Sequence, residues 1–220
     1  MKAIIFDLDG TLIDSLTDIA LCMNEVLEKL NYPTHDINKY NYFVGDGALV
    51  LTQNALPKNS SQEEINKVLE HFKELYDLGI HNNTKPYEGI RELLRALESS
   101  VLKVGILSNK PHAFTLKYAQ KFFSDFTLEE VHGQKENVPK KPHPAGALDI
   151  ANAFRLKPCE IVYVGDTATD IKTAKNAGMQ SIGVLWGFRT KEELVENGAD
   201  YIVETPQQIW DIIQKNQIVS

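Results

Sequence analysis

Two carboxylates near the start of the chain, Asp7 and Asp9, are the residues best suited to chemistry. They directly follow the apolar run Ala3–Phe6, which is typical of a strand buried on both faces of a parallel sheet. Ligands bind at the carboxyl ends of such strands. Two acids held this close repel each other unless a cation, a proton or a covalent role offsets their charge. One carboxylate could therefore act as a nucleophile and the other could move protons, with a metal ion shared between them.

An anion-binding site is suggested by two further stretches. Ser108 and Asn109 follow the apolar run 104–107 and offer a hydroxyl and a backbone N–H. Lys141 precedes Pro142, which restricts the backbone of the lysine and suits a point charge aimed at phosphate. Taken alone, each stretch is more simply explained by a helix cap, a turn or a solvated basic loop.

A second pair of acids, Asp166 and Asp170, follows the apolar run 161–164. Asp166 could face Asp7 from a neighbouring strand and complete an all-oxygen site for Mg²⁺. A helix cap at Asp166 or Thr167 explains the same residues. Capping gives no reason, however, for a lysine joined to so many acids at one edge of the sheet. A hard metal ion together with a phosphoryl group explains all of them.

Short apolar runs and helical periods alternate along most of the chain, which predicts a doubly wound parallel α/β sheet. The predicted strands lie near residues 2–7, 101–107, 128–131, 161–164, 181–185 and 201–203. Residues 15 to 80 show helical periods only. We therefore predict an α/β core domain from residues 1–14 plus 84–220. An inserted α-helical cap domain, residues 15–83, is expected over the carboxyl edge of the sheet.

Residue pairs with the spacing of a capping box predict where helices begin. Examples are Ser15 with Asp18, Ser61 with Glu64, and Thr190 with Glu193. The helix that begins after Ser61 has an apolar face, and this face ends at Leu75 and Tyr76.

The 220 residues include 23 Lys and Arg against 30 Asp and Glu, a net charge of −7. This balance argues against a general nucleic-acid binder, which needs a basic surface. An anionic substrate must therefore find positive charge inside its site. Two cysteines, Cys22 and Cys159, cannot form a disulfide framework and indicate a reducing compartment. We recognise no signal peptide and no membrane span, and we expect a cytoplasmic monomer or homodimer.

Four stretches resemble, in their order along the chain, the motifs of the haloacid dehalogenase superfamily. They are Asp7-Leu8-Asp9-Gly10-Thr11-Leu12, Ser108-Asn109-Lys110-Pro111, Lys141-Pro142-His143-Pro144 and Gly165-Asp166-Thr167-Ala168-Thr169-Asp170. The helical segment after the first stretch is similar to the α-helical cap of that superfamily. Within the superfamily the chain most resembles the phosphoglycolate phosphatase group, notably at Val44-Gly45-Asp46-Gly47 and Trp186-Gly187-Phe188-Arg189.

The resemblance implies a role for each acid. Asp7 is the nucleophile and forms an aspartyl-phosphate. Asp9 is the general acid that protonates the leaving oxygen and then the base that activates water. Mg²⁺ is held by Asp7, Asp166 and the backbone carbonyl of Asp9, and Asp170 supports either the metal or the lysine.

The resemblance also implies which residues bind the phosphoryl oxygens, namely Thr11, Ser108, Asn109 and Lys141. An anionic carboxylate that attacks an anionic phosphate is opposed electrostatically, and Mg²⁺ with Lys141 offsets that opposition. Asp9 distinguishes a phosphatase from a dehalogenase, because only ester hydrolysis needs a proton donor to an alkoxide.

The expected activity is Mg²⁺-dependent hydrolysis of a small phosphorylated metabolite, with 2-phosphoglycolate as the best candidate. The carboxylate of that substrate needs a cation, and the sequence offers four without ranking them: Lys39, Lys110, His112 and Arg189. The residues expected to select the substrate are Gly45, Asp46, Gly47, Lys110 and Arg189.

Alternative functions remain open on the same residues. A phosphosugar mutase or a pyrophosphatase could use the same core. In the mutases the position of Thr11 is usually valine or a similar residue, so Thr11 favours hydrolysis. A receiver-like signalling domain, which accepts a phosphoryl group, also combines a doubly wound sheet with acids, a hydroxyl and a lysine. It is shorter, however, and has no inserted cap.

Overall fold

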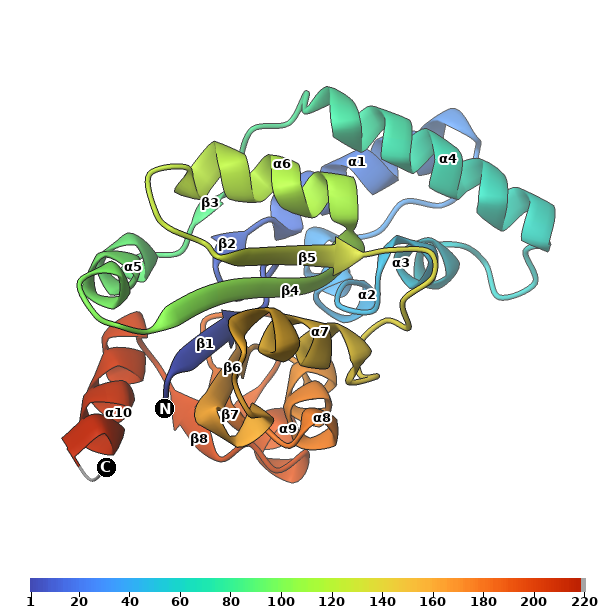
Figure 1. Ribbon diagram of the computed structural model, residues 1–220. Coiled ribbons are helices and arrows are strands. Elements are labelled where there is room, and N and C mark those ends of the chain that lie inside the picture. Colours follow the sequence, from blue (N-terminus) through green and yellow to red (C-terminus); the bar gives the residue numbers. More distant parts are fainter. Residues whose placement is uncertain (219–220) are drawn as a thin grey trace.

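The computed structural model describes residues 1–218 and is built around a six-stranded sheet in the order β5-β4-β1-β6-β7-β8 (Figure 1). All neighbouring strands of this sheet are parallel. The strands are β1 (Ala3–Phe6), β4 (Lys103–Pro111), β5 (Glu130–Gln134), β6 (Ile161–Gly165), β7 (Gln180–Val184) and β8 (Tyr201–Val203). The predicted α/β fold class is therefore confirmed.

Helices cover both faces of the sheet, and β1 shows how they pack. Because successive side chains of a strand point to opposite faces, Ile4 and Phe6 pack with α5, α6 and α10, whereas Ala3 and Ile5 pack with α7 and α8. These helices and their connections are α5 (Ile90–Glu98), α6 (His112–Phe123), α7 (Ala145–Phe154), η2 (Pro158–Glu160), α8 (Ala168–Ala177), α9 (Lys191–Glu196) and α10 (Pro206–Ile218). Within residues 1–218, no helix has the length and apolarity needed to cross a membrane.

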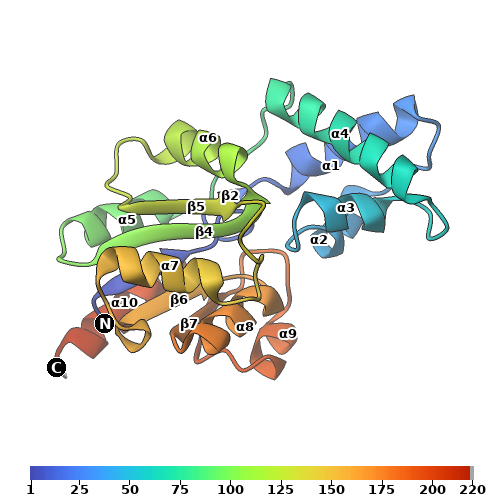
Figure 2. The ribbon, with the colours of Figure 1, turned by 45° about the vertical axis from the view of Figure 1, so that its right-hand side comes forward.

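Residues 15–83, which we call the helical insert, stand beyond the carboxyl ends of the strands (Figure 2). The insert contains α1 (Leu16–Lys29), η1 (Ile37–Lys39), α2 (Tyr40–Phe43), α3 (Ala48–Ala55) and α4 (Gln62–Leu78). The chain enters and leaves it through two short antiparallel strands, β2 (Ile13–Asp14) and β3 (Lys85–Pro86). The insert thus lies next to the sheet edge at which the polar motifs end.

Two of the predicted helix starts are stabilised as expected. At the start of α4, Ser61 N–H donates to Glu64 Oε2 at 2.7 Å and Glu64 N–H donates to Ser61 Oγ at 3.3 Å, which completes the capping box. At the start of α9, Thr190 Oγ1 accepts from Glu193 N–H at 3.4 Å.

The capping box predicted at Ser15 and Asp18 is wrong. Ser15 Oγ donates to Asp9 Oδ1 at 2.6 Å instead of capping α1. Asp18, which is 3% exposed, accepts from the backbone N–H groups of Asn83 and Thr84, each at 2.9 Å. These donors lie 65 and 66 residues further along the chain, where it leaves the insert. Asp18 therefore ties the start of the insert to its end.

Strand β4 is longer than the sequence predicts. Its apolar run stops at Leu107, but the strand continues through Ser108 and Asn109 to Pro111, which pairs with Gln134 after an irregularity in register. Polar residues can extend a strand because the ladder is made by backbone groups. Ser108 and Asn109 consequently lie on the strand itself and not on a loop beyond it.

Candidate active site

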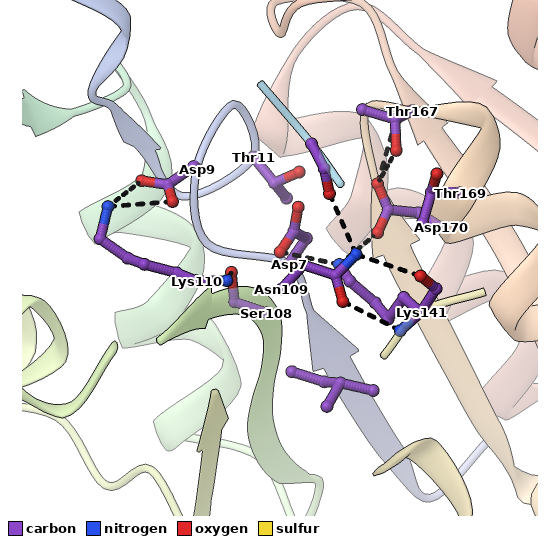
Figure 3. A network of polar contacts seen from close by, with 12 residues as sticks. Asp7, Asp9, Thr11, Ser108, Asn109, Lys110, Lys141, Thr167, Thr169 and Asp170 are labelled. Carbon is purple, nitrogen blue, oxygen red and sulfur yellow. Dashed lines mark hydrogen bonds and ion pairs between the residues drawn. The ribbon is translucent and has the colours of Figure 1, made fainter. Parts of the chain in front are cut away.

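The order of the strands brings the predicted site residues to one edge of the sheet. Strand β1 lies between β4 and β6, and Phe6 pairs with Ile106 on one side and Val164 on the other, so Asp7 lies between the segments that carry Ser108 and Asp166. Lys141, from the connection between β5 and α7, reaches the same place (Figure 3). Its Nζ lies 2.9 Å from Asp7 Oδ1. Residues that are far apart in the sequence therefore converge on Asp7.

Three buried carboxylates, Asp7, Asp166 and Asp170, can each place one oxygen within 4.8 Å of the other two. Lys141 Nζ is close to Asp7 Oδ1, but within the described residues no hydrogen bond is donated to this oxygen. Several carboxylate oxygens around one point are the ligands that Mg²⁺ prefers. We call these three residues the acid cluster, and they fit a divalent cation.

Burial perturbs the acids of this cluster. Burial raises the pKa of Asp7 to about 7, against the opposing pull of Lys141. Burial, together with the carboxylates of Asp170 and Asp7, raises the pKa of Asp166 to about 8. Three acids beside one lysine leave an excess of negative charge, which a divalent cation would offset. The electrostatics of the cluster therefore support the same metal site as its geometry.

Asp166 is held in place by two donors. Thr11 Oγ1 donates to Oδ1 at 3.0 Å, and the N–H of Phe188 donates to Oδ2 at 2.8 Å. Gly10 passes so close that a Cβ there would collide with the Asp166 carboxylate, and its φ of 88° also favours glycine. The hydroxyl of Thr11, which the sequence analysis assigns to phosphate, is thus directed at Asp166.

Lys141 is fixed at both its ends. Its Nζ donates to Asp170 Oδ1 at 2.6 Å, and its backbone N–H donates to Asn109 Oδ1 at 2.9 Å. Burial acts to lower the pKa of Lys141, but Asp170 and Asp7 outweigh it and hold the pKa well above its usual range. Lys141 is therefore a fixed positive charge beside Asp7. The amide of Asn109, predicted to bind phosphate, instead holds the loop that carries Lys141.

Asp170 has two sets of partners. Its Oδ2 accepts from Thr167 Oγ1 at 2.7 Å and from Thr167 N–H at 3.1 Å, a capping box at the start of α8. Its Oδ1 binds Lys141. Asp170 therefore links the start of α8 to Lys141.

Asp9 lies outside the acid cluster. Lys110 Nζ donates to its two carboxylate oxygens at 3.0 Å each, and Ser15 Oγ donates to Oδ1 at 2.6 Å. Figure 3 shows Asp9 and Lys110 facing each other, apart from Lys141 and its partners. The side chain of Asp9 is thus separate from the three carboxylates of the acid cluster.

A pocket lies between these residues and the helical insert. Asp7, Asp9 and Ser108 are among the residues that line it. Ser108 Oγ accepts from the N–H of Lys110 at 3.2 Å, which leaves the hydrogen of the hydroxyl for a donated bond. The rest of the wall is mainly apolar and includes Ile19, Val44, Ala48, Leu51, Phe72, Tyr76, Pro111 and Phe114.

The candidates for substrate selection differ in their distance from the pocket. Gly45, Gly47 and Lys110 line it. Of the cations considered for a substrate carboxylate, Lys39 is exposed on η1 and His112 accepts a backbone N–H through Nδ1. Among the described residues that line the pocket, Lys110 has the one basic side chain.

Asp46 and Arg189 join the insert to the core instead of lining the pocket. Asp46 Oδ1 accepts from Thr169 Oγ1 at 2.9 Å. Arg189 reaches across to the insert, where it donates to the carbonyls of Asn41 and Val44. These contacts hold one side of the insert against the core.

Tyr76 is a pocket residue that the sequence analysis missed. Its ring is buried on the apolar face of α4, as predicted, but its hydroxyl also accepts from Lys110 Nζ at 2.9 Å. The sequence does offer one indication of this role: a tyrosine at a core position has a buried hydroxyl that needs a hydrogen-bond partner. The contribution of Phe188 was also missed, since it comes from the backbone and no side-chain pattern reveals it.

Comparison with known proteins agrees with this geometry. A family model for haloacid dehalogenase-like hydrolases matches residues 4–184. A curated phosphoglycolate phosphatase from Haemophilus influenzae is 29% identical over 219 residues, which cover 96% of this chain and 98% of the relative. A phosphoglycolate phosphatase from Mannheimia succiniciproducens is 30% identical over 210 residues, covering 92% and 94%.

Solved structures show the same similarity. The crystal structure of a predicted phosphoglycolate phosphatase from Haemophilus somnus has a TM-score of 0.90 and 30% identity, and the match covers 97% of this chain and 98% of that one. A β-phosphoglucomutase from Clostridium difficile has a TM-score of 0.76 and 22% identity over the full length of both chains. The latter likeness concerns the fold alone.

Proposed function

The chain belongs to the haloacid dehalogenase-like hydrolases, and on this basis we propose that it is a Mg²⁺-dependent phosphatase that hydrolyses a small phosphomonoester through an aspartyl-phosphate on Asp7. One observation carries the proposal: Asp7 lies 2.9 Å from the buried ammonium of Lys141, inside the acid cluster, and also lines the pocket. A nucleophile, a fixed positive charge and a metal site thus share one position.

The first step is attack by Asp7 on phosphorus. Lys141 offsets the repulsion between the two anions, and the free hydrogen of Ser108 Oγ can donate to a phosphoryl oxygen. Mg²⁺, held by Asp7, Asp166 and the backbone carbonyl of Asp9, would supply Lewis-acid stabilisation of the phosphoryl charge. Asp170 keeps Lys141 in place.

Asp9 is proposed to move the protons. It protonates the leaving oxygen as the bond from phosphorus to that oxygen breaks, and afterwards accepts a proton from the water that attacks the aspartyl-phosphate. In the structure Asp9 accepts hydrogen bonds from Lys110 and Ser15.

The helical insert is proposed to act as a cap, with residues 15–83 as the cap domain and residues 1–14 plus 84–220 as the core. Its apolar side chains form much of the pocket wall, so a bound phosphoryl group would be screened from bulk water. Contacts such as that between Asp46 and Thr169 support a closed position of the insert in this structure.

The names of the relatives make 2-phosphoglycolate the first substrate to test. The test measures release of inorganic phosphate from 2-phosphoglycolate and from 4-nitrophenyl phosphate, in Mg²⁺ and in EDTA. We expect turnover in Mg²⁺ only, and we expect Asp7→Asn to abolish it while the fold is retained by circular dichroism. Asp211→Asn, at an exposed position on α10, is the control.

The same assay separates the alternatives. A mutase would return the phosphoryl group to a sugar phosphate and release little inorganic phosphate. A receiver-like protein would be phosphorylated without turning over. Substantial activity of Asp7→Asn would remove Asp7 from the role of nucleophile.

A further inference from the structure

The pocket that Asp7 lines has fewer polar than apolar side chains and a mainly apolar wall. Away from Asp7, Asp9 and Ser108, most of its wall consists of aliphatic and aromatic side chains from the insert and from α6. Ile19, Leu51 and Phe72 are each 4% exposed, so they pack against the pocket as part of the core of the insert. A leaving group placed here meets carbon atoms on that side.

Lys110 is the basic side chain that lines the pocket, and its donors are already engaged. Its Nζ donates to both oxygens of Asp9 at 3.0 Å and to Tyr76 Oη at 2.9 Å. An ammonium group has three hydrogens, and three acceptors surround this one. The nearby negative charge of Asp9 also balances the charge of Lys110.

Aromatic rings enclose the same ammonium. Nζ of Lys110 lies 4.7 Å from the ring centroid of Tyr76 and 4.6 Å from that of Tyr118. Tyr76 of the insert stacks on Tyr118 of α6, with centroids 5.7 Å apart, and contacts Phe114 edge-on at 5.5 Å. A substrate carboxylate would therefore have to displace Asp9 and enter an aromatic enclosure in order to bind Lys110.

From this lining we infer that the preferred substrates are phosphomonoesters of uncharged, apolar alcohols, alkyl or aryl, and not esters that carry a carboxylate beside the phosphate. The inference rests on the proposed phosphatase function and narrows its substrate class. It departs from the substrate that the names of the relatives suggest. Among the described residues that line this pocket, a carboxylate would find no cation without an acidic partner, and it would lose its hydration against the apolar wall.

A matched pair of substrates tests this directly. Ethyl phosphate and 2-phosphoglycolate have the same two-carbon chain on the ester oxygen and differ by a methyl group in place of a carboxylate. We expect kcat/KM for ethyl phosphate to equal or exceed that for 2-phosphoglycolate in Mg²⁺. A preference of tenfold or more for 2-phosphoglycolate would overturn the inference.

A second series tests the apolar wall. Methyl, ethyl, propyl and butyl phosphate have leaving groups of nearly equal acidity, so differences in kcat/KM report burial of the alkyl chain. We expect a rise of roughly threefold per methylene until the pocket is filled. No rise along the series would overturn the inference.

Two leucine variants locate the effect. Leu51 lines the pocket, whereas Leu75 is buried on α4 of the same insert without lining it. We expect Leu51→Ala to lower the ratio of kcat/KM for butyl to methyl phosphate severalfold, and Leu75→Ala to leave that ratio unchanged. Equal changes in the two variants would mean that general loosening of the insert, and not the wall, sets the preference, which would overturn the inference.

The wild-type comparisons need no variant, so a folding failure of Leu51→Ala leaves the inference testable. Failure of the inference also differs from failure of the proposed function. If no phosphomonoester is hydrolysed in Mg²⁺, the phosphatase proposal is wrong. If wild type is active but favours 2-phosphoglycolate, the phosphatase stands and only the apolar substrate class falls.

Discussion

Replacing Asp166 by Asn is expected to make the metal-free protein more stable at neutral pH. Asp166 is fully buried, and its pKa is raised from 3.8 to about 8, chiefly by burial. A carboxyl group with a higher pKa in the folded state has no effect on stability below the unfolded pKa. It then lowers stability progressively as the pH rises from the unfolded pKa to the folded one. Asn keeps the shape of Asp but cannot ionise.

The size of the effect follows from the shift. Between the unfolded and the folded pKa, each pH unit changes the free energy of unfolding by about 1.4 kcal/mol. From the unfolded pKa to pH 7 this amounts to roughly 4 kcal/mol in favour of Asp166→Asn. The bonds to the carboxylate can be retained, because Asn can accept from Phe188 N–H and donate to the hydroxyl of Thr11.

The assay is urea unfolding between about pH 5 and pH 8 in EDTA, repeated in saturating Mg²⁺. In EDTA the advantage of Asp166→Asn should grow with pH and level off near the folded pKa. At a concentration of ~100 times its Kd, Mg²⁺ should stabilise wild type by about 2.7 kcal/mol and the variant much less. An advantage that does not change with pH, or equal stabilisation of both proteins by Mg²⁺, would refute the assignment of Asp166 to a metal-binding cluster of buried acids.

Three other substitutions test separate parts of the structure. Asp9→Asn should slow phosphate release by roughly 10²–10⁴-fold, the scale of acid–base assistance, and a near-normal rate in steady-state assays would exclude that role. Lys141→Ala should raise the inhibition constant of vanadate by ~10–10²-fold, because one charged donor is lost, and an unchanged constant would contradict it. Asp18→Ala should lower the free energy of unfolding by roughly 3 kcal/mol in urea titrations, since the N–H groups of Asn83 and Thr84 lose their acceptor. Asp36→Ala, at an exposed position of the insert, is the control for that titration.

The core of the site could be predicted from sequence because it depends on strand ends. Asp7 and Asp166 each follow a run of buried residues, and the parallel order of β1 and β6 places such ends side by side. Lys141 was found through the motif in which it occurs and not through any strand. The fold class could be predicted from the alternation of short apolar runs with segments of helical periodicity.

Side-chain partners could not be predicted in the same way. Ser15 and Asp18 have the local spacing of a capping box, yet each bonds a residue outside that turn. The hydroxyl of Thr11 also finds a partner 155 residues away. The hydrogen-bond partner of such a side chain depends on which groups the tertiary fold brings within about 3 Å of it, and the local sequence does not predict this.

The short pairing of β2 with β3 has a consequence for how this molecule could change over time. The chain enters and leaves the insert at adjacent points, because β2 pairs with β3. The residues between these two strands could therefore be replaced without moving β1 or α5. The catalytic residues Asp7, Asp9 and Ser108 would stay in place after such a replacement, whereas the pocket residues of the insert would change. Replacing one continuous segment, the helical insert, could therefore change which phosphate ester is accepted while the catalytic residues of the core are kept.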